Sequence, residues 1–457
     1  MNAPITLSGL DALLGAVDDM AVQPADLQAS GALIADAVAC MVGAQAVAAA
    51  QPVVQWARKQ PQSPQTSALV LAALSNVLEM DAMHVASSVH PGTVVVPAAL
   101  ALAMDVNASG PDLARAVLRG TEAAIRLGRA TGIPHRQRFQ STSTCGGVGA
   151  ALACAGLLHL TREQSLDAMS NMASIAGGLW AFLEEDALTK QWHAGRVAEG
   201  AVLAAQLAAV GLRGAHRVLD GKRGFLTVLC DGGNPPELGM QRERWQIHDI
   251  AYKPWPSPRP THAAITAALN ARERTGGVTI ERVVLSTYGF AIDLCNRHPV
   301  VTPHDARFSL RHCVAVALAD DAVGFAAFEP DAIARHAALV SRIEVREDPQ
   351  MTAAYPALSK AALEISLANG ETIVESVDHA LGDPELPLSA EQRQKKFHAL
   401  LALASIPGEG NLQKDIGAIA SDAKTPAGLL DRMFHHAGLR FVSGRTATDT
   451  ALSKETT

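Results

Sequence analysis

The sequence predicts a mostly α-helical protein that carries a smaller α+β domain. Hydrophobic residues make up 48% of the 457 positions but aromatic residues only 4%, so the core must be built from Ala, Leu and Val at close spacing. That composition favours tightly packed helices over an aromatic-rich β-sandwich. Helical periodicity in the first half and alternating strand patterns in the second place the two kinds of structure in different parts of the chain. The length also exceeds one ordinary domain.

The first half of the chain is expected to be helical throughout. Residues 6–58 have the periodicity of two or three helices, and the turn-forming residues 61–67 precede another helix with Thr66 or Ser67 as its N-cap. Gly128 is placed to end a later helix, because glycine is common just after a helix C-terminus. The helices after residue 60 are expected over 68–78, 93–106, 111–127 and 197–210.

The second half contains the strand patterns. Residues 363–374 alternate apolar and polar side chains around Asn369-Gly370, which predicts a hairpin with a type I′ turn. Ser389 and Gln392 have the spacing of a capping box that opens a last helix. Other elements are expected as strands over 280–288 and 341–345 and helices over 305–318 and 331–339. The predicted domains are a helical domain over 1–264 with 388–444, an α+β domain over 265–387, and a tail over 445–457.

Charge and cysteine content argue against several classes of protein. The formal net charge of -7 is small, and no dense Lys/Arg cluster indicates a nucleic-acid partner. Asp11 and Asp18 fall where a signal peptide carries positive charge, and no Lys or Arg precedes Arg58. The longest apolar runs, such as 94–104 and 145–158, are too short to span a membrane. The six scattered cysteines are typical of packed thiols in a reducing compartment, so we expect a cytoplasmic protein without a membrane partner.

The stretch over residues 79–97 is the strongest candidate for a functional site. It places Asp81, His84 and His90 within ten positions. A carboxylate and two imidazoles this close are costly to bury unless they bond one another or a ligand. His90 precedes Pro91-Gly92, which forces a loop, and loops on a rigid scaffold often carry sites. The alternative is a helix-capping loop whose histidines hydrogen-bond to the backbone.

A second candidate is the run of hydroxyl residues and glycines over 139–149, which precedes an Ala-rich helix. The free amides at such a helix start, at Gln140 and Ser141, suit an anion such as a carboxylate. The alternative is close helix packing through the glycines. Cys145 could act as a nucleophile, but no base lies near it in the sequence, so a packed thiol is the simpler interpretation.

A third candidate is Lys190, which lies at a helix start where the helix dipole disfavours a cation. A bound anion explains a lysine at this position. The alternative is a salt bridge to one of the preceding acidic residues, Glu184, Glu185 or Asp186.

A fourth candidate is the proline-rich segment that follows residue 250. Four prolines within residues 254–260 exclude helix and central strand, and they lead into a helix that starts near Thr261. His262 lies in the first turn of that helix, where the dipole keeps a histidine neutral and able to act as a base. Lys253 and Arg259 in this segment are candidates to bind a carboxylate.

Five motifs follow one another along the chain: Asp81 with His90-Pro91-Gly92; residues 139–149; Thr189-Lys190 with His193 and Gly195; Lys253-Pro254-Trp255-Pro256-Ser257 with His262; and Ala306-Arg307-Phe308-Ser309. Together they resemble the signature of the MmgE/PrpD family, which includes 2-methylcitrate dehydratases, cis-aconitate decarboxylases and iminodisuccinate epimerases. The resemblance implies a large all-helical domain, formed by the N-terminal half and a C-terminal segment, and a smaller α+β lid domain.

The same resemblance implies what the protein does and needs. It implies a homodimer, a small anionic carboxylate as substrate, and neither a metal nor an organic cofactor. It places a site between the two domains that contains the catalytic residues Asp81, His90, Lys190 and His262. The substrate-binding residues would be His84, Gln140, Ser141, Lys253, Arg259 and His312.

The reactions of this family share the movement of a proton at a carbon next to a carboxylate or imine. Such carbon acids are weak, so a base tuned near neutrality and cations facing the developing negative charge are required. We expect Lys190 to hold a substrate carboxylate. His90 or His262 would move the proton, and Asp81 would fix the tautomer of an imidazole.

Three features of the sequence depart from the family pattern or bear on the reaction. Gln140 stands where the family usually has histidine, and His312 stands where it usually has an aromatic residue. The acidic cluster of the first motif is reduced to Asp81, beside His84. We expect a lyase, either a dehydratase or a decarboxylase, because most characterised relatives of this fold are lyases.

Three alternatives compete with the lyase. An epimerase would need proton carriers on opposite faces of the substrate, with His312 opposite His90 as one arrangement. A carboxylate-binding protein without catalysis is motivated by Gln140. A metal site is disfavoured because His84 and His90 are six positions apart, not the four that put ligands on one helix face.

Overall fold

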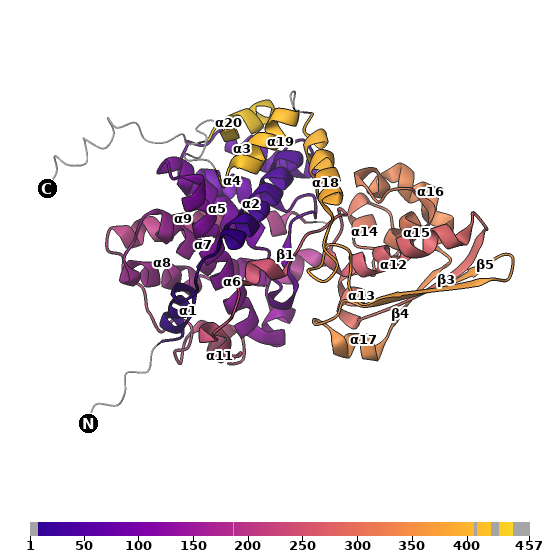
Figure 1. Cartoon of the computed structure of the whole chain (residues 1–457), viewed down its shortest axis with the longest axis horizontal. Helices are drawn as coiled ribbons and strands as arrows, with labels where there is room; N and C mark the ends of the chain where they lie inside the picture. Colours follow the sequence, from indigo (N-terminus) through magenta and orange to yellow (C-terminus); the bar gives the residue numbers. More distant parts are fainter. Residues whose placement is uncertain (1–7, 186, 406–408, 422–428, 442–457) are drawn as a thin grey trace. The chain divides into compact units, whose positions relative to one another are not determined.

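The computed structural model describes residues 8–185, 187–405, 409–421 and 429–441, and it confirms a mostly α-helical fold with a smaller α+β part (Figure 1). The chain divides into a larger unit of Met1–Val77, Asp81–Ile250 and Gln394–Thr457 and a smaller unit of Leu78–Met80 and Ala251–Arg393. The smaller unit begins before the predicted residue 265, because the end of the proline-rich segment packs against its helices. The predicted tail over 445–457 lies outside the described residues.

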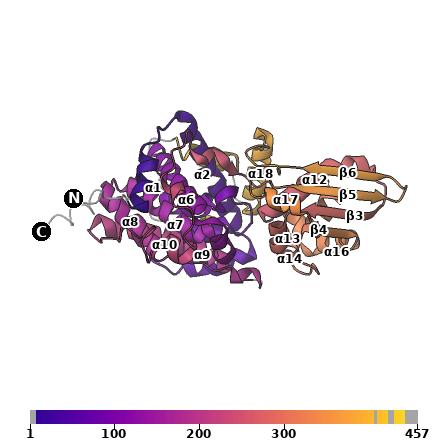
Figure 2. The same cartoon turned by 90° about the horizontal axis from the view of Figure 1, so that it is seen from below.

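The larger unit is built from helices, with two short strands beside them (Figure 1 and Figure 2). Its helices are α1 (Gly9–Asp18), α2 (Pro24–Ala44), α3 (Gln51–Ala57), α4 (Pro64–Ser75), α5 (Pro91–Asp105), α6 (Gly110–Arg138), α7 (Ser141–Leu157), α8 (Arg162–Ser174), α9 (Thr189–Ala209), α10 (Phe225–Leu229) and α11 (Pro236–Gly239). The C-terminal helices are α18 (Ala390–Leu403), which begins in the smaller unit, α19 (Glu409–Ala418) and α20 (Leu429–Met433). The short strands are β1 (Met83–His84) and β2 (Ile250–Ala251), of which Ala251 belongs to the smaller unit.

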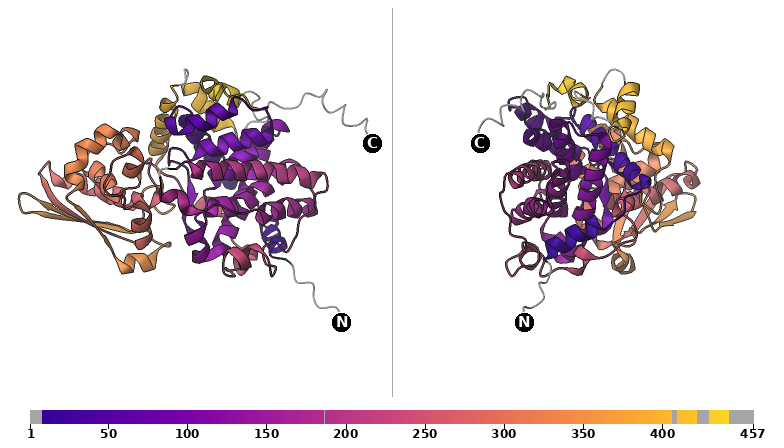
Figure 3. Two further views of the ribbon diagram at one scale, coloured as in Figure 1. Left: turned by 180° about the vertical axis from the view of Figure 1, so that it is seen from behind. Right: turned by 60° about the vertical axis from the view of Figure 1, so that its left-hand side comes forward.

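Helix α7 lies at the centre of the larger unit. It packs against α5, α6, α8 and α9, and all of its residues except Gly156 are buried. Figure 3 shows the long helices of this unit stacked beside one another. Where α6 crosses α7, a Cβ on Gly120 would lie 2.5 Å from the Gly149 carbonyl oxygen, and a Cβ on Gly149 only 2.1 Å from that of Gly120. Close helix packing through glycine is therefore confirmed for Gly149.

Two helices of the larger unit begin earlier than predicted. Helix α4 starts at Pro64, because the Ser63 hydroxyl accepts the Thr66 N–H at 3.0 Å and proline suits the first helical position. Helix α9 starts at Thr189 instead of residue 197, which places Lys190 inside the helix. In both cases the first turn of the helix is rich in polar residues, so the apolar periodicity placed the helix start too late.

The prediction that Gly128 ends a helix is wrong. Helix α6 continues to Arg138 and is interrupted only at Gly132, whose φ is 73°. Gly128 instead permits a close approach, because a Cβ there would lie 2.7 Å from the Val89 side chain and 2.9 Å from Ser87. The glycine therefore lets the loop that carries the candidate histidines pack directly on α6.

Helix α2 is long and apolar enough to cross a membrane by length and composition alone. In the structure, however, 61% of its apolar window is buried, and Leu33, Ile34 and Val38 are fully enclosed. A core helix has these same properties. Helix α2 is therefore accounted for as part of the core of the larger unit.

The smaller unit is a four-stranded sheet with helices against one face (Figure 1 and Figure 2). The strand order is β4-β3-β5-β6, with β3 parallel to β4 and antiparallel to β5, and β5 antiparallel to β6. Helices α12 and α15 pack on the sheet and on each other. The strands are β3 (Ile280–Thr287), β4 (Ile343–Glu347), β5 (Ala361–Leu367) and β6 (Thr372–Val377). The helices are α12 (His262–Arg272), α13 (Gly289–Cys295), α14 (Pro303–Arg307), α15 (Leu310–Ala319), α16 (Pro330–Val340) and α17 (Pro349–Ala354).

Local capping decides where several of these elements end. The capping box of Ser389 and Gln392 is confirmed, with reciprocal hydrogen bonds of 2.8 and 3.1 Å. The helix predicted over 305–318 is instead two helices, because Ser309 caps the second by accepting the His312 N–H at 3.3 Å.

The β5–β6 hairpin forms as predicted, but the predicted type I′ turn is wrong. Asn369 lacks the positive φ that this turn requires, and only Gly370 has one, at 84°. The Gly370 N–H donates to the Leu367 carbonyl oxygen at 2.9 Å. This arrangement is a turn that ends on a left-handed glycine, the usual form of a three-residue hairpin loop.

Candidate functional site

The closest pair of predicted site residues is His90 and Asp81, both in the larger unit. The His90 Nδ1 atom lies 2.7 Å from Asp81 Oδ2, and that oxygen also accepts the Thr93 hydroxyl at 2.8 Å. The imidazole contact is short but departs from hydrogen-bond geometry, so we describe it as an electrostatic contact. The Asp81 side chain is 2% exposed and that of His90 16%, so the carboxylate is enclosed while part of the ring reaches the surface.

The start of helix α5 places these groups. His90 precedes the helix, Pro91 occupies its first position, and Thr93 lies in its first turn, one helical turn from His90. The His90 N–H donates to the Thr142 hydroxyl oxygen at 3.0 Å. Because Thr142 lies in the first turn of α7, the N-terminal ends of α5 and α7 meet at His90.

The start of α7 also contacts α9. Gln140 precedes α7, and its Oε1 atom accepts the His193 Nδ1–H at 3.0 Å. Burial lowers the pKa of His193. Lys190 lies three residues before His193, so the two side chains share one face of α9. Ser141 is fully buried at the start of α7, and its hydroxyl has no hydrogen-bond partner among the described residues.

His84 holds the loop instead of presenting a free imidazole. Its Nδ1 accepts the Ser87 N–H at 3.2 Å and lies 2.9 Å from the Ser87 hydroxyl. Burial, with smaller effects from Arg129, Arg136 and Arg242, lowers the pKa of His84 to about 3. The helix-capping interpretation therefore describes His84, which caps the short 3₁₀ turn Val85–Ser87.

Cys145 is a packed thiol. It is fully buried, and burial raises the pKa of its thiol to about 12. A thiol that stays protonated at neutral pH is a poor nucleophile. The structure therefore favours the packed-thiol interpretation over the nucleophile.

The smaller unit carries the other predicted residues, of which Lys253 and His262 are fully buried. The Lys253 Nζ donates to the Glu79 carbonyl oxygen at 3.1 Å and lies 3.5 Å from the Glu79 carboxylate. His262 is the first residue of α12, as predicted, and its Nε2 lies 3.1 Å from the Ser257 carbonyl oxygen. The Trp255 ring meets the His262 ring edge-on, with centroids 5.2 Å apart.

Arg259 and His312 each make a contact within the smaller unit, and each keeps one buried nitrogen, Nη1 and Nδ1, without a hydrogen-bond partner among the described residues. Arg259 forms a buried ion pair with Asp383. The His312 Nε2–H donates to the Ala327 carbonyl oxygen at 2.8 Å, and burial lowers the pKa of His312. Asp383, His379 and Glu385 bring possible metal ligands within 4.8 Å of one another, but a dication would have to displace Arg259 from Asp383.

Sequence reasoning missed several residues that contact the predicted ones. Thr93 and His193 could have been found, because each lies three positions along a helix from a predicted residue, His90 or Lys190. Glu79 and Arg307 carry no comparable signal, because residues far apart in sequence bring them into electrostatic range. Arg307 belongs to a motif that was recognised but was not assigned a role.

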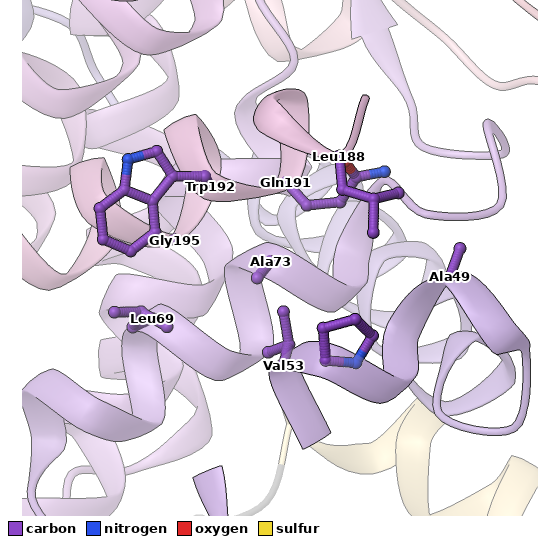
Figure 4. Close-up of a pocket in the computed structure, with 9 residues that line it drawn as sticks. Ala49, Val53, Leu69, Ala73, Leu188, Gln191, Trp192 and Gly195 are labelled. Atoms are coloured by element: carbon purple, nitrogen blue, oxygen red, sulfur yellow. The ribbon is translucent and has the colours of Figure 1, made fainter. Parts of the chain in front are cut away.

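An apolar pocket in the larger unit contains none of the predicted site residues (Figure 4). Its volume is about 90 Å³, and Leu188 and Gln191 from the start of α9 face Val53 and Ala73 from α3 and α4 across it. Trp192 at its edge is 58% exposed. Its lining is Ala49, Pro52, Val53, Leu69, Ala73, Leu188, Gln191, Trp192 and Gly195. A lining this apolar does not suit a polycarboxylate.

Comparison with known proteins supports the motifs described above. Residues 26–238 match the MmgE/PrpD N-terminal domain, and residues 255–415 match the MmgE/PrpD C-terminal domain. The chain is 28% identical to cis-aconitate decarboxylase of Homo sapiens over 339 residues, which covers 70% of this chain and 68% of that protein. It is 27% identical to the Mus musculus cis-aconitate decarboxylase over 368 residues (75% and 73%) and 25% identical to that of Aspergillus terreus over 373 residues (75% of each). The chain therefore belongs to the MmgE/PrpD family.

Proposed function

We propose that this chain is a cofactor-independent lyase that acts on a small di- or tricarboxylate, and that it releases carbon dioxide. The observation that carries the proposal is the 2.7 Å contact between His90 and the enclosed Asp81. The similar proteins from three organisms are all cis-aconitate decarboxylases, which favours decarboxylation over dehydration.

The His90–Asp81 contact defines which ring nitrogen moves the proton. We assign Nε2 as the nitrogen that gives or takes the proton, because Nδ1 lies 2.7 Å from the Asp81 carboxylate and faces away from the reacting carbon in this assignment. In a decarboxylation the bond to the departing carboxylate breaks, and its electron pair delocalises toward a remaining carboxylate. The His90 imidazolium then delivers its Nε2 proton to carbon and recovers one from water, so each carbon dioxide released consumes one proton.

Lys190 is the residue we assign to a substrate carboxylate in the larger unit. It is the second residue of α9 and shares a helix face with His193, which contacts the start of α7. A lysine ammonium stabilises negative charge as it develops on the substrate. The free N-terminal amides of a helix act in the same sense.

The epimerase alternative assigns a second proton carrier to His312. That residue is fully buried and its Nε2–H is donated to the Ala327 carbonyl oxygen, so only its Nδ1, which has no hydrogen-bond partner among the described residues, could carry a proton for this alternative. The alternative of a carboxylate-binding protein without catalysis depended on Gln140, which is held by His193.

The test is incubation of the purified chain with cis-aconitate and related tri- and dicarboxylates in deuterated water. We expect carbon dioxide release with one deuterium incorporated at carbon, and loss of this activity in His90→Gln. Loss of water would identify a dehydratase, and isotope exchange without mass loss an epimerase. Binding of these acids without any turnover would overturn the enzymatic proposal.

We also propose that the chain forms a homodimer through the outer face of α9. Trp192, Leu203 and Leu207 on this helix and Val210 at its C-cap recur at helical spacing, and between 38% and 82% of each is exposed. Apolar residues gathered on one exposed face mark an interaction surface. Leu207→Lys should shift the mass measured by light scattering to that of a monomer. The equivalent change at the exposed Val374 of the smaller unit should not. The cytoplasmic location and the absence of nucleic-acid or membrane partners stay predictions from the sequence.

A further inference from the structure

Side-chain hydroxyls attach the first turn of α7 to other parts of the larger unit. The Thr142 hydroxyl oxygen accepts the His90 N–H at 3.0 Å. Two positions further along, the Thr144 hydroxyl oxygen lies 2.7 Å from Nε2 of His135, a residue in the last turn of α6. His135 belongs to none of the motifs recognised in the sequence, and no role has been given to it so far. A buried histidine that holds the same helix turn as His90 therefore requires an explanation.

The His135 ring is fully buried and held on several sides. Its Nδ1 lies 3.1 Å from the Leu229 carbonyl oxygen, which can only accept, so we assign the ring proton to Nδ1. The Phe139 ring stacks on the imidazole and the Phe225 ring is tilted against it, with centroids 5.2 and 5.5 Å away. Burial lowers the pKa of His135, so the ring stays neutral at neutral pH. Nε2 is therefore an acceptor, and the Thr144 hydroxyl donates to it.

The Thr144 hydroxyl has only one proton to donate, and its other neighbours are poorer partners. The Gln140 carbonyl oxygen, four positions earlier, lies 3.5 Å away, and the Cys145 sulfur lies 3.6 Å away. A threonine that donates to the carbonyl oxygen four positions earlier destabilises its helix slightly and often bends it. Because His135 accepts the proton instead, the first turn of α7 avoids this bend.

We propose that His135 is a positioning residue for His90. By accepting the Thr144 hydroxyl proton, it fixes the helix turn on which Thr142 accepts the His90 N–H. The His90 imidazole lies 2.7 Å from Asp81, so a displaced turn would move the ring relative to this carboxylate. The effect on catalysis rests on the function proposed above, whereas the control of the His90 position does not.

The first test is kinetic and uses cis-aconitate or the related acid that the full chain turns over. Thr144→Val keeps the shape of the side chain and removes its donor. We expect kcat to fall about tenfold and KM to change less than about twofold, because the substrate still binds while the proton carrier is displaced. Thr144→Ser keeps the hydroxyl and should keep kcat within about threefold of the wild type.

A double-mutant cycle tests whether His135 and Thr144 act through one bond. His135→Asn keeps a donor for the Leu229 carbonyl oxygen but is too short to reach Thr144. Adding Thr144→Val to His135→Asn should therefore cost little further kcat, since the bond is already lost. Fully additive losses would overturn the proposal.

The second test observes His90 without any turnover, by NMR of the full chain with isotope-labelled histidine rings. The His90 signals are identified by their loss in His90→Gln, and Thr144→Val should shift them. Thr131→Val is the matched control, because Thr131 is also fully buried but its hydroxyl donates to Gly128 of its own helix, at 2.8 Å. Both variants should lower the melting temperature about equally, since each loses one buried hydrogen bond. Only Thr144→Val should move the His90 signals or kcat.

Unchanged His90 signals in Thr144→Val, or an equal shift in Thr131→Val, would overturn the proposal. Failure of Thr144→Ser to preserve kcat would also overturn it. The outcome is separable from that of the proposed function. A shift of the His90 signals in Thr144→Val, without turnover of any acid, would reject the lyase and keep the positioning role. Turnover with an unchanged kcat in Thr144→Val would keep the lyase and reject the positioning role.

Discussion

The two units of this protein differ in how the charges of their candidate site residues are compensated. In the larger unit, the Asp81 oxygen that faces His90 also accepts the Thr93 hydroxyl, so the charge there is compensated by close partners. In the smaller unit, the fully buried Lys253 lies 3.5 Å from the Glu79 carboxylate. A group that moves a proton must be held in one tautomer, which requires partners. A group that binds an anion must keep charge to spare. The difference agrees with the roles proposed above, which are proton transfer at His90 and anion binding at Lys253.

The largest effect is expected at His90. His90→Gln removes the proton carrier, and kcat should fall by about 10²–10⁴-fold. His248→Gln is the control, because the His248 Nε2 lies the same 2.7 Å from a carboxylate oxygen, that of Asp26, but joins segments 222 residues apart. The two rates are compared under saturating substrate. An equal fall in kcat in both variants would mean that the His90–Asp81 pair has a structural role, as the His248–Asp26 pair does, and does not transfer the proton.

The next effect is expected in the smaller unit. Lys253→Gln should raise KM by about 30-fold and change kcat less, because it removes a charge that binds the substrate carboxylate in ground and transition states alike. Lys360→Gln is the control, since Lys360 pairs with Asp378 at 2.8 Å on the surface. Steady-state kinetics separate the two parameters. If kcat of Lys253→Gln fell as far as that of His90→Gln, Lys253 would take part in the chemical step and not only in binding.

A third expectation concerns stability and pH. The pKa of His84 falls from 6.5 to about 3 on folding, so below pH 6.5 the unfolded chain takes up a proton that the folded chain refuses. The stabilisation is complete above pH 6.5 and is lost progressively as the pH falls toward 3, with a cost of about 2 kcal/mol at pH 5. Urea unfolding at pH 7.5 and 5.0 measures this difference, and His84→Asn should reduce it. An identical pH dependence in the variant would show that His84 is not held neutral.

The smallest effect is expected at Thr93. Thr93→Val removes one hydrogen bond to Asp81 but leaves the His90 contact, so kcat should fall by less than about tenfold. Thr121→Val is the control, because Thr121 is fully buried and its hydroxyl has no partner among the described residues. A loss as large as that of His90→Gln would make Thr93 a direct participant in proton transfer.

The parts of the fold and the candidate site that the sequence predicted are mostly local. Asp81 and His90 meet across a loop in which they are nine positions apart, and the spacing of Ser389 and Gln392 predicted a cap that forms. Alternation predicted the hairpin. It could not predict the turn type, because the conformation of Asn369 depends on how the strands twist.

The parts that failed depend on packing between distant segments. Gly128 is a residue type common at helix ends, but here it lets Val89 and Ser87 pack close to the helix. That packing is visible only in the folded chain. Arg307 was recognised within a motif, yet Glu79, one of the carboxylates that act to raise its pKa, lies more than 200 positions earlier in the sequence. Hydrophobic periodicity in the sequence does not predict which distant residues come close in the folded chain.

The contact between Gly120 and Gly149 has a consequence for how this protein can vary. Neither residue touches the candidate site, but Gly149 lies two turns along the helix whose first residues hold His90 and His193. A methyl group at either position would push α6 and α7 apart. The resulting tilt of α7 would displace the polar residues at its N-terminal end. In a mutational scan scored for growth, both positions should tolerate only the smallest residue, and they would resemble active-site positions while doing no chemistry.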